Sequence, residues 1–402
     1  MAGAPVASAH AVLLRATPPG GQTLSQSPDQ VQLLFSEPLD PEFSRVQVVD
    51  AAGARVDLDD SQLDPNNDRL LSVSLSPGLG DGIYTVLWRN LSAVDVHPDE
   101  GEYRLFVGVP VVSESSLQTG LQNTATPETT IGRWWFYLAA SLFGGVLATW
   151  KLILWPLVGK DDKLRARAYR LIVAGGVLLI LGTLFSAVAQ AAAAANVPLL
   201  DAFGQPLAGL LTRGRFASIW WPRLGLEVAS LGLIVFGGLD GLASECALAT
   251  LPAVLLTSAL TSHGAALQTG AAPGIAIDWL HIVGATLWVG GLMALAAFLP
   301  ALGSKREVVS RFGRLALIAS MLVLLSGVLQ GALELGSPGA VLATLYGQLL
   351  LVKVGLLVGM LGLAALNRAR GFGRGVGVEL ALGVLVFGVA AMLSGTPPTP
   401  SI

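Results

Sequence analysis

Only four histidines occur in this chain of 402 residues, and two of them follow a carboxylate at a short spacing. His97 comes two residues after Asp95, so both side chains leave one face if the segment is extended. His281 comes three residues after Asp278, so both lie on one face of a helix. Imidazole and carboxylate groups on a common face are suitable ligands for a transition metal. Both pairs are therefore candidate metal sites.

His10 directly follows the small-residue segment Ala7–Ala9, which resembles a signal-peptidase cleavage site. Residues 1–9 lack the basic and apolar regions of a complete signal peptide, so either they are its remnant or the resemblance is accidental. After such a cleavage His10 would carry a free α-amine beside its imidazole. Together with Asp95 and His97 it would form a nitrogen-rich, tetragonal site suited to Cu(II). The alternative is that Asp95 is a turn residue and His97 an ordinary loop histidine.

The composition indicates that much of the chain lies in a bilayer, because 53% of the residues are hydrophobic and only 13% are charged. A net charge of -3 gives no electrostatic reason to expect a nucleic-acid partner. The single cysteine, Cys246, excludes an internal disulfide framework. No nucleophile–base arrangement stands out, so we do not expect an enzyme.

Residues 10–109 contain short runs that alternate apolar and polar side chains, separated by Pro, Gly and Asp. This pattern predicts an all-β sandwich or barrel. Residues 110–130 are polar and rich in Ser and Thr, and we interpret them as a linker.

Long apolar runs fill residues 131–402, where a helix needs about 20 residues to cross about 30 Å of hydrocarbon. The sequence therefore predicts an all-α membrane bundle. We expect eight spans, near residues 134–157, 170–195, 217–238, 244–262, 275–300, 312–334, 342–365 and 377–394.

Basic residues concentrate in the loops after the first, fifth and seventh predicted spans. With eight spans these loops lie on one side, which the positive-inside rule makes cytoplasmic. The β-domain and the C-terminus are then on the outer side. The basic residues are Lys160, Lys163, Arg165, Arg167 and Arg170 in the first loop, Lys305, Arg306, Arg311 and Arg314 in the second, and Arg368, Arg370 and Arg374 in the third.

In this topology His263 ends the fourth span, and Asp278 and His281 lie near the outer end of the fifth. Ionisable groups inside a span are costly and are functional candidates. The three residues could form a second metal site, with Asp278 as a ligand or as the group that fixes the tautomer of His281. Alternatively, Asp278 caps its helix, and both histidines are satisfied by hydrogen bonds between helices.

Two further charges, Glu227 and Lys353, fall near the centres of the third and seventh predicted spans. Opposite charges at similar depth predict an intramembrane pair. Such a pair is either structural or compensates the charge of a passing cation.

Three stretches of the first hundred residues read ATPPGGQTL, VQLLFSEPLDPEFSRVQVVDAAG and GIYTVLWRNLSAVDVHPDEGEYRLFVG. With them, residues 10–109 resemble the CopC family of periplasmic copper-binding proteins. The resemblance implies a cupredoxin-like β-sandwich in which His10, Asp95 and His97 bind Cu(II). It also places Glu37, of the FSEP segment, at an acidic position near the metal.

The segment departs from the CopC pattern in two ways. Val96 stands where the family has glycine between the two ligands. No methionine occurs between Met1 and Met293, so the thioether ligands of a Cu(I) site are absent from this domain. We therefore expect a site for Cu(II) only.

The stretches LTSHGAA, DWLHIVGATLWVGGL, TLYGQLLLVKVGLLVGMLGLAALNR and VELALGVLVFGVAAML resemble the CopD family. They cover most of residues 255–394, with weaker similarity from residue 131 onward. A CopC–CopD fusion of this kind is typical of bacterial copper-uptake proteins. The resemblance implies a multi-pass protein of the bacterial cytoplasmic membrane with its β-domain on the periplasmic side.

Three functions agree with these observations. In the first, the exported domain captures Cu(II), and the bundle moves copper across the membrane for uptake or resistance. Other periplasmic copper carriers are possible partners that deliver the ion. The chain lacks the GxxxxGK[ST] pattern, so ATP hydrolysis within it would not drive this step. In the second, His263 and His281 hold a haem or copper centre of a membrane redox protein. In the third, the bundle anchors a copper sensor or chaperone.

Overall fold

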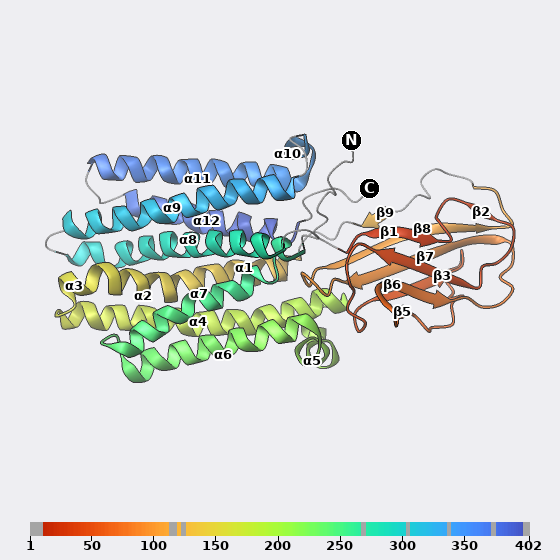
Figure 1. Cartoon of the computed structure of the whole chain (residues 1–402), viewed down its shortest axis with the longest axis horizontal. Helices are drawn as coiled ribbons and strands as arrows, with labels where there is room; N and C mark the ends of the chain where they lie inside the picture. Colours follow the sequence, from red (N-terminus) through yellow and green to blue (C-terminus); the bar gives the residue numbers. More distant parts are fainter. Residues whose placement is uncertain are drawn as a thin grey trace.

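A β-domain stands at one end of a bundle of long helices in the computed structural model (Figure 1). The structure describes residues 11–111, 119–121, 126–266, 271–302, 306–335, 339–370 and 375–396. Eight helices of the described part are long and apolar enough to cross a membrane. The predicted fold class, a β-domain followed by an eight-span bundle, is confirmed.

Two sheets form the β-domain and bury their apolar faces against each other. The first has the strand order β1-β3-β6-β5, and the second has the order β2-β8-β7-β4 with β9 beside β8. In the core, the rings of Phe35 and Trp88 meet edge to face with centroids 5.3 Å apart. The strands are β1 Leu13–Thr17, β2 Thr23–Leu24, β3 Gln30–Phe35, β4 Arg45–Val49, β5 Gln62–Asp64, β6 Asn67–Ser74, β7 Gly82–Leu91, β8 Pro98–Val107 and β9 Thr119–Leu121.

Ordered structure occupies part of the segment that we interpreted as a linker. Strand β9 pairs antiparallel with β8. Helix α1 begins at Pro127, where the side chain of Thr126 accepts a hydrogen bond from the backbone N–H of Thr129. Proline in the first turn and threonine at the N-cap are both favoured at a helix start.

The first span, Pro127–Val158, is continuous but not uniformly α-helical. It runs through α1 (Pro127–Ala140), the π-helical turn η2 (Ser141–Gly145), α2 (Val146–Thr149), the π-helical turn η3 (Trp150–Leu154) and α3 (Trp155–Val158). The other spans are α4 (Asp162–Ala195), α6 (Gly214–Gly237), α7 (Leu242–Ala259), α8 (Ala271–Phe298, extended by η6, Leu299–Ala301), α9 (Arg306–Glu334), α11 (Leu345–Arg370) and α12 (Gly375–Leu393).

Short helical segments complete the part of the bundle that faces the β-domain. They are η4 (Leu199–Ala202), α5 (Gln205–Thr212), η5 (His263–Ala266) and α10 (Ala340–Ala343). Figure 1 shows α5 and α10 at the end of the bundle nearest the β-domain.

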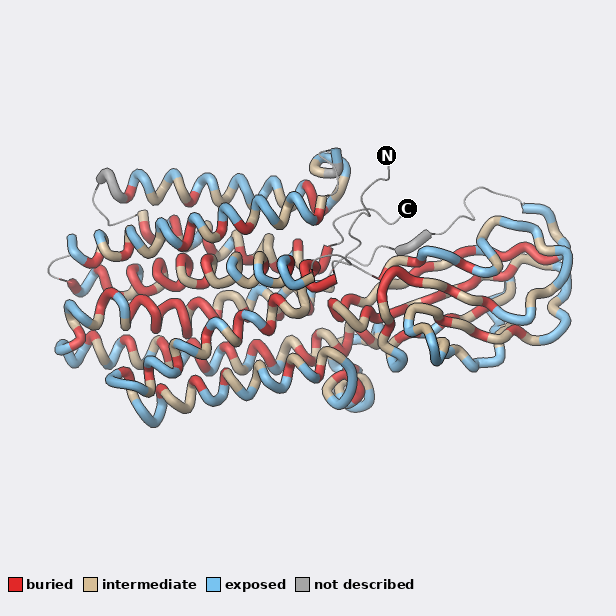
Figure 2. Tube along the Cα trace, in the orientation of Figure 1, coloured by how far each residue is buried: buried red, intermediate tan, exposed pale blue. Residues whose placement is uncertain are grey.

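Small residues bring the central helices of the bundle into close contact. A Cβ atom added to Gly290 of α8 would lie 2.5 Å from Cα of Gly145 in η2, closer than any packing allows. Glycine at such a crossing lets two membrane helices approach through their backbones. Figure 2 shows the inner helices largely buried, whereas α11 is exposed along most of its length. The exposed face of α11 is the face that lipid would cover.

Candidate metal centre

Ser92 holds together the turn between β7 and β8. Its hydroxyl accepts hydrogen bonds from the backbone N–H groups of Val94 (3.0 Å) and Asp95 (3.2 Å) and donates to Glu37 Oε2 (2.6 Å). The backbone N–H of Ser92 donates to the His97 carbonyl at 3.0 Å. A serine that bonds the backbone just ahead of it stabilises a tight turn. This turn places the side chains of Asp95 and His97 next to each other.

Asp95 and His97 contact each other through two pairs of atoms. Oδ1 of Asp95 accepts a hydrogen bond from the His97 backbone N–H at 3.1 Å, and Oδ2 lies 3.0 Å from His97 Nδ1. Both side chains are buried. A carboxylate beside one ring nitrogen orients the imidazole, as it does for histidines that ligate metals.

Val96, between these two residues, has a backbone φ of 62°. A β-branched residue rarely adopts this left-handed conformation, whereas glycine adopts it easily. The Val96 side chain is buried in an apolar cluster with Ala191 of α4 and Leu210 of α5. Its carbonyl accepts a hydrogen bond from Gln190 Nε2 at 2.5 Å. Valine at this position therefore anchors the turn on the bundle.

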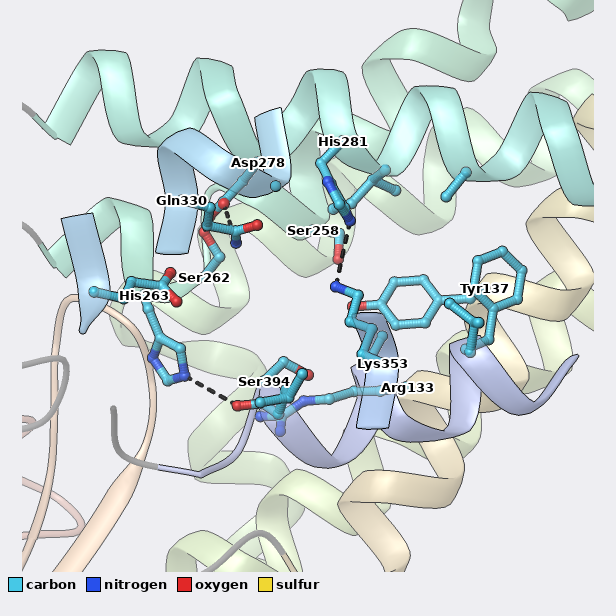
Figure 3. Close-up of a pocket in the computed structure, with 18 of the residues that line it drawn as sticks. Arg133, Tyr137, Ser258, Ser262, His263, Asp278, His281, Gln330, Lys353 and Ser394 are labelled. Atoms are coloured by element: carbon cyan, nitrogen blue, oxygen red, sulfur yellow. Dashed lines mark hydrogen bonds between the residues drawn. The ribbon is translucent and has the colours of Figure 1, made fainter. Parts of the chain in front are cut away.

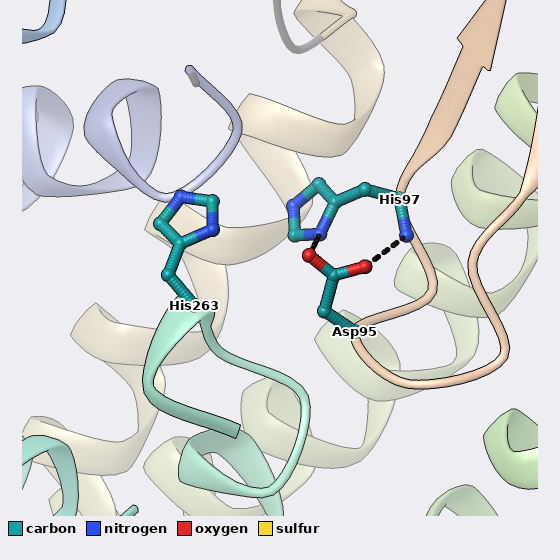
Figure 4. Close-up of side chains that lie close together, drawn as sticks. All are labelled: Asp95, His97 and His263. Atoms are coloured by element: carbon teal, nitrogen blue, oxygen red, sulfur yellow. Dashed lines mark hydrogen bonds and ion pairs between the residues drawn. The ribbon is translucent and has the colours of Figure 1, made fainter. Parts of the chain in front are cut away.

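His263, from the η5 segment of the bundle, meets the Asp95–His97 pair (Figure 4). The rings of His97 and His263 are stacked, with centroids 5.2 Å apart and planes 27° from parallel. One ligand atom from each of Asp95, His97 and His263 lies within 4.8 Å of the other two. We call these three residues the junction site, because its ligands come from both parts of the molecule.

The His263 ring is neutral at physiological pH. Burial lowers its pKa to about 4, and the neighbouring His97 acts in the same direction. A neutral imidazole is the form that binds a metal ion. The sequence placed His263 in a second site with Asp278 and His281, whereas the structure groups it with Asp95 and His97.

Arg133 of α1 and the end of α12 close the junction site. Nη2 of Arg133 lies 3.0 Å from His97 Nε2, and the carbonyl of Ser394 lies 2.9 Å from the same nitrogen. The guanidinium favours a lone pair on Nε2, whereas the carbonyl favours a proton there. The sequence analysis missed Arg133, although an arginine two turns into an apolar span is a recognisable signal.

Glu37 lies beside the junction site. Burial raises the pKa of Glu37 to about 9, and the negative charge of Asp95 adds to this effect. Its contact is with the hydroxyl of Ser92, the residue that shapes the ligand turn. His10, the remaining predicted ligand, lies outside the described residues.

A second polar group lies between α8, α9 and α11 (Figure 3). Asp278 accepts hydrogen bonds from Ser262 Oγ and from Gln330 Nε2, the latter at 2.5 Å. Nζ of Lys353 lies 3.3 Å from His281 Nε2. We call this group the bundle cluster, and its members are Asp278, His281, Gln330, Glu334, Tyr346 and Lys353.

The sequence analysis missed Gln330, Glu334 and Tyr346. Gln330 and Glu334 lie one turn apart on α9, and the hydroxyl of Tyr346 donates to Glu334 Oε2. A polar pair at that spacing near the end of an apolar span is a signal for a shared, inward-facing side of the helix.

One cavity of about 790 Å³ connects the two groups. Asp95, Arg133 and His263 line it near the β-domain, and His281 and Lys353 line it within the bundle. Ser262 precedes His263 in the chain and donates to Asp278, so the two groups also share one backbone segment. The pair of histidines considered as haem ligands is divided between the groups, since His263 stacks on His97 and His281 contacts Lys353.

Glu227 and Lys353 have different partners, and the predicted pair between them is wrong. Glu227 accepts a hydrogen bond from Thr183 at 2.9 Å, and the cation that acts on it is Arg223, one turn earlier on α6. Lys353 instead contacts His281. Similar depth did not place the two side chains on facing sides of their helices.

Comparison with known proteins agrees with both parts of this architecture. Residues 13–108 match the CopC domain, and residues 306–393 match Copper resistance protein D. Over 414 residues the chain is 31% identical to Copper transport protein CutJ of Bacillus subtilis (strain 168), a match that covers 98% of this chain and 75% of CutJ. The chain belongs to this CopC–CopD family. The predicted fusion of the two domains is therefore confirmed.

Two of the solved structures similar to this family member each match 24% of the chain. The crystal structure of CopC from Methylosinus trichosporium OB3b is 31% identical, with 93% of it covered and a TM-score of 0.23. PcoC, a methionine-rich copper resistance protein from Escherichia coli, is 26% identical, with 98% of it covered and a TM-score of 0.21.

Proposed function

We propose that the β-domain captures Cu(II) at the outer face of a bacterial cytoplasmic membrane and that the bundle moves copper through that membrane toward the cytoplasm. Membership of the CopC–CopD family supports a role in copper binding and in copper transport or resistance. The observation that carries the proposal is the junction site, in which imidazoles from the β-domain and the bundle stack 5.2 Å apart.

The donor set of the junction site favours Cu(II). It offers two imidazoles and a carboxylate, and His10 with its α-amine would add two nitrogen ligands after cleavage. Residues 13–108 contain no methionine, so the soft thioether ligands that stabilise Cu(I) are absent from the domain.

Transfer at this site needs only an exchange of ligands. Copper held by Asp95 and His97 would already lie within reach of His263, so it can change partners without release into water. His263 then presents it to the cavity that leads to His281. An ion that passes directly between neighbouring ligands is never left without ligands inside the membrane, and this lowers the free-energy cost of its passage.

The positions of the basic residues support the proposed orientation. The connection from α3 to α4 lies at the end of the bundle opposite the β-domain (Figure 1), and it carries Lys160 and Lys163. Helix α9 begins at that same end, with Arg306 as its first residue. The positive-inside rule assigns this end to the cytoplasm and the β-domain to the periplasmic side.

Copper uptake into vesicles that contain the purified full chain tests the proposal. We expect the variants His97→Gln and His263→Gln each to lower the initial rate at least about tenfold, the smallest loss typical of a damaged metal site. Asp29→Asn, which changes an exposed carboxylate of the β-domain, is the control for these variants and should transport at the parent rate.

Three outcomes would contradict the proposal. Parent-like uptake by both histidine variants would remove the junction site from the path. Uptake absent from the parent protein, with tight Cu(II) binding retained, would instead favour a membrane-anchored sensor or chaperone. A Soret band in the visible spectrum of the purified protein would favour the redox alternative.

A further inference from the structure

Lys353 contacts a histidine whose tautomer is fixed by its surroundings. Nδ1 of His281 lies 3.0 Å from Ser326 Oγ. The Ser326 hydroxyl gives its single hydrogen to a backbone carbonyl one turn earlier, that of Leu322, so its oxygen accepts from the His281 Nδ1–H. Nε2 of His281 therefore carries the lone pair, and the Lys353 ammonium donates to it at 3.3 Å.

This is the arrangement of a histidine prepared to bind a metal ion. Metal-ligating histidines commonly donate through one ring nitrogen to a fixed acceptor and ligate through the other. Here the ligating position faces the cavity, and an ammonium group occupies it. A lysine gains little from a neutral imidazole, so the contact with His281 does not explain why a charge lies within a span.

The charges that balance Lys353 are the carboxylates of Asp278 and Glu334, which act on it electrostatically. Asp278 has hydrogen bonds to both carboxylate oxygens. Glu334 receives a hydrogen bond from Tyr346 on Oε2, and Gln330 also acts on this carboxylate. Glu334 lines the same cavity as Lys353, so it is the carboxylate toward which the ammonium can move.

We propose that His281 is a transit ligand for copper in the bundle and that the Lys353 ammonium occupies its Nε2 between copper ions as a tethered substitute cation. This inference rests on the proposed copper path and deepens it. Copper arriving from His263 displaces the ammonium toward Glu334, and Lys353 returns to His281 when copper leaves. The two carboxylates balance the charge of either cation.

A tethered cation has two consequences for transport. When copper is absent, the ammonium supplies the counter-charge for two carboxylates inside the bilayer. It also lowers the affinity of the cluster for copper, because the ammonium and the metal compete for one nitrogen and repel each other. A transit site must release its cargo, and weak binding makes release fast.

Copper titration of the purified full chain tests this role, in a background that carries Asp95→Asn and His97→Gln so that the junction site is removed. Copper(II) sulfate is added with and without ascorbate, and bound metal is measured by elemental analysis after desalting. We expect Lys353→Met to raise copper affinity about fivefold, since unit charges about 4 Å apart interact by about 1 kcal/mol even in water. Lys353→Arg keeps the charge and should bind copper as the background does.

The matched control is Lys151→Met, which removes another lysine from a span, one that contacts Glu245 at 3.6 Å. It should leave copper binding unchanged. Adding His281→Gln to Lys353→Met should abolish the gain in affinity. Size-exclusion profiles and thermal unfolding establish that each variant is folded, and Lys353→Gln serves as a second neutral variant.

Either of two results would overturn the inference. One is an unchanged copper affinity in both neutral variants, which would leave Lys353 as a structural charge. The other is a gain in affinity that survives His281→Gln. Both results are measured in protein that lacks the junction site. They therefore test this inference separately from the proposed function, which the uptake rates of the His97 and His263 variants test.

Discussion

The junction site and the bundle cluster both pair a histidine nitrogen with a basic side chain, but they treat the histidine differently. His97 Nε2 lies 3.0 Å from Arg133 and 2.9 Å from the Ser394 carbonyl, two neighbours that favour opposite tautomers. His281 has one tautomer, because Ser326 accepts from its Nδ1. The nitrogen of His97 that faces away from Asp95 therefore lies between a donor and an acceptor, whereas Nε2 of His281 faces a donor, the Lys353 ammonium.

The two sites also differ in what holds them together. The junction site depends on the docking of the β-domain onto the bundle, through contacts such as the burial of Val96 against α4. The bundle cluster lies within packed helices and needs no contact from the β-domain. Perturbations of docking should therefore affect the first site alone, and perturbations of the shared η5 segment should affect both.

The largest effect is expected for Gly264→Ala, which changes the segment shared by the two sites. Its Cβ would lie 2.7 Å from Asp278 Oδ2 and 2.8 Å from the carbonyl carbon of Gly274. Overpacking of this kind costs about 1–3 kcal/mol of unfolding free energy, and here it displaces Asp278 and the neighbouring His263 together. Thermal unfolding and copper titration of each site measure the loss.

Gly232→Ala is the control for this change, because a Cβ at Gly232 of α6 meets nothing within 4 Å. It should leave unfolding and copper binding at parent values. If Gly264→Ala weakened copper binding at only one site, the two sites would not be coupled through η5.

A smaller effect, of opposite sign, is expected for Arg133→Met. Removing a cation that lies 3.0 Å from His97 Nε2 should raise the Cu(II) affinity of the junction site. The gain is about fivefold, by the same estimate of charge repulsion as for Lys353. Titration followed by electron paramagnetic resonance measures it, with Arg133→Lys as the variant that keeps the charge. A decrease in affinity would show that Arg133 supports the ligands instead of competing with the metal.

The smallest effect is expected for Val96→Gly, which separates backbone strain from docking. Relief of the left-handed backbone is worth about 1–2 kcal/mol, and the buried valine side chain contributes about 1.5–3 kcal/mol. The two terms nearly cancel in unfolding free energy, whereas Cu(II) affinity at the junction should fall by a few-fold, on the order of 1 kcal/mol. Val96→Ala keeps the strain and loses the packing, so it should be the less stable of the two variants. The reverse order in thermal unfolding would contradict this account of the turn.

Sequence reasoning succeeded where an element or a contact depends on local spacing. The side chains of Asp95 and His97 lie next to each other because they occupy one turn, and the eight candidate spans follow from the length of apolar runs. The sequence shows that Val96 replaces the glycine of the CopC pattern. It does not show the structural role of this valine, because Ala191 and Leu210, which share its apolar cluster, lie in helices far along the chain.

Sequence reasoning failed where a contact depends on the rotation of helices or on the docking of domains. Hydropathy gives the depth of Glu227 and Lys353 but not the side of the helix on which each lies, and α6 and α11 turn these residues toward different neighbours. The partnership of His97 with His263 arises only when the β-domain docks. Neither kind of information is contained in a local pattern of residues.

The enclosed position of the first span has a consequence for biosynthesis. In its most apolar window 72% of the residues are buried, against 6% in the span formed by α11, so this helix lies among the other described spans. Its Trp134 indole donates to the carbonyl of Val384 in α12, and its Arg133 meets Ser394 at the same nitrogen of His97. Val384 lies 250 residues after Trp134 in the chain. A nascent chain therefore cannot complete the junction site until α12 is inserted.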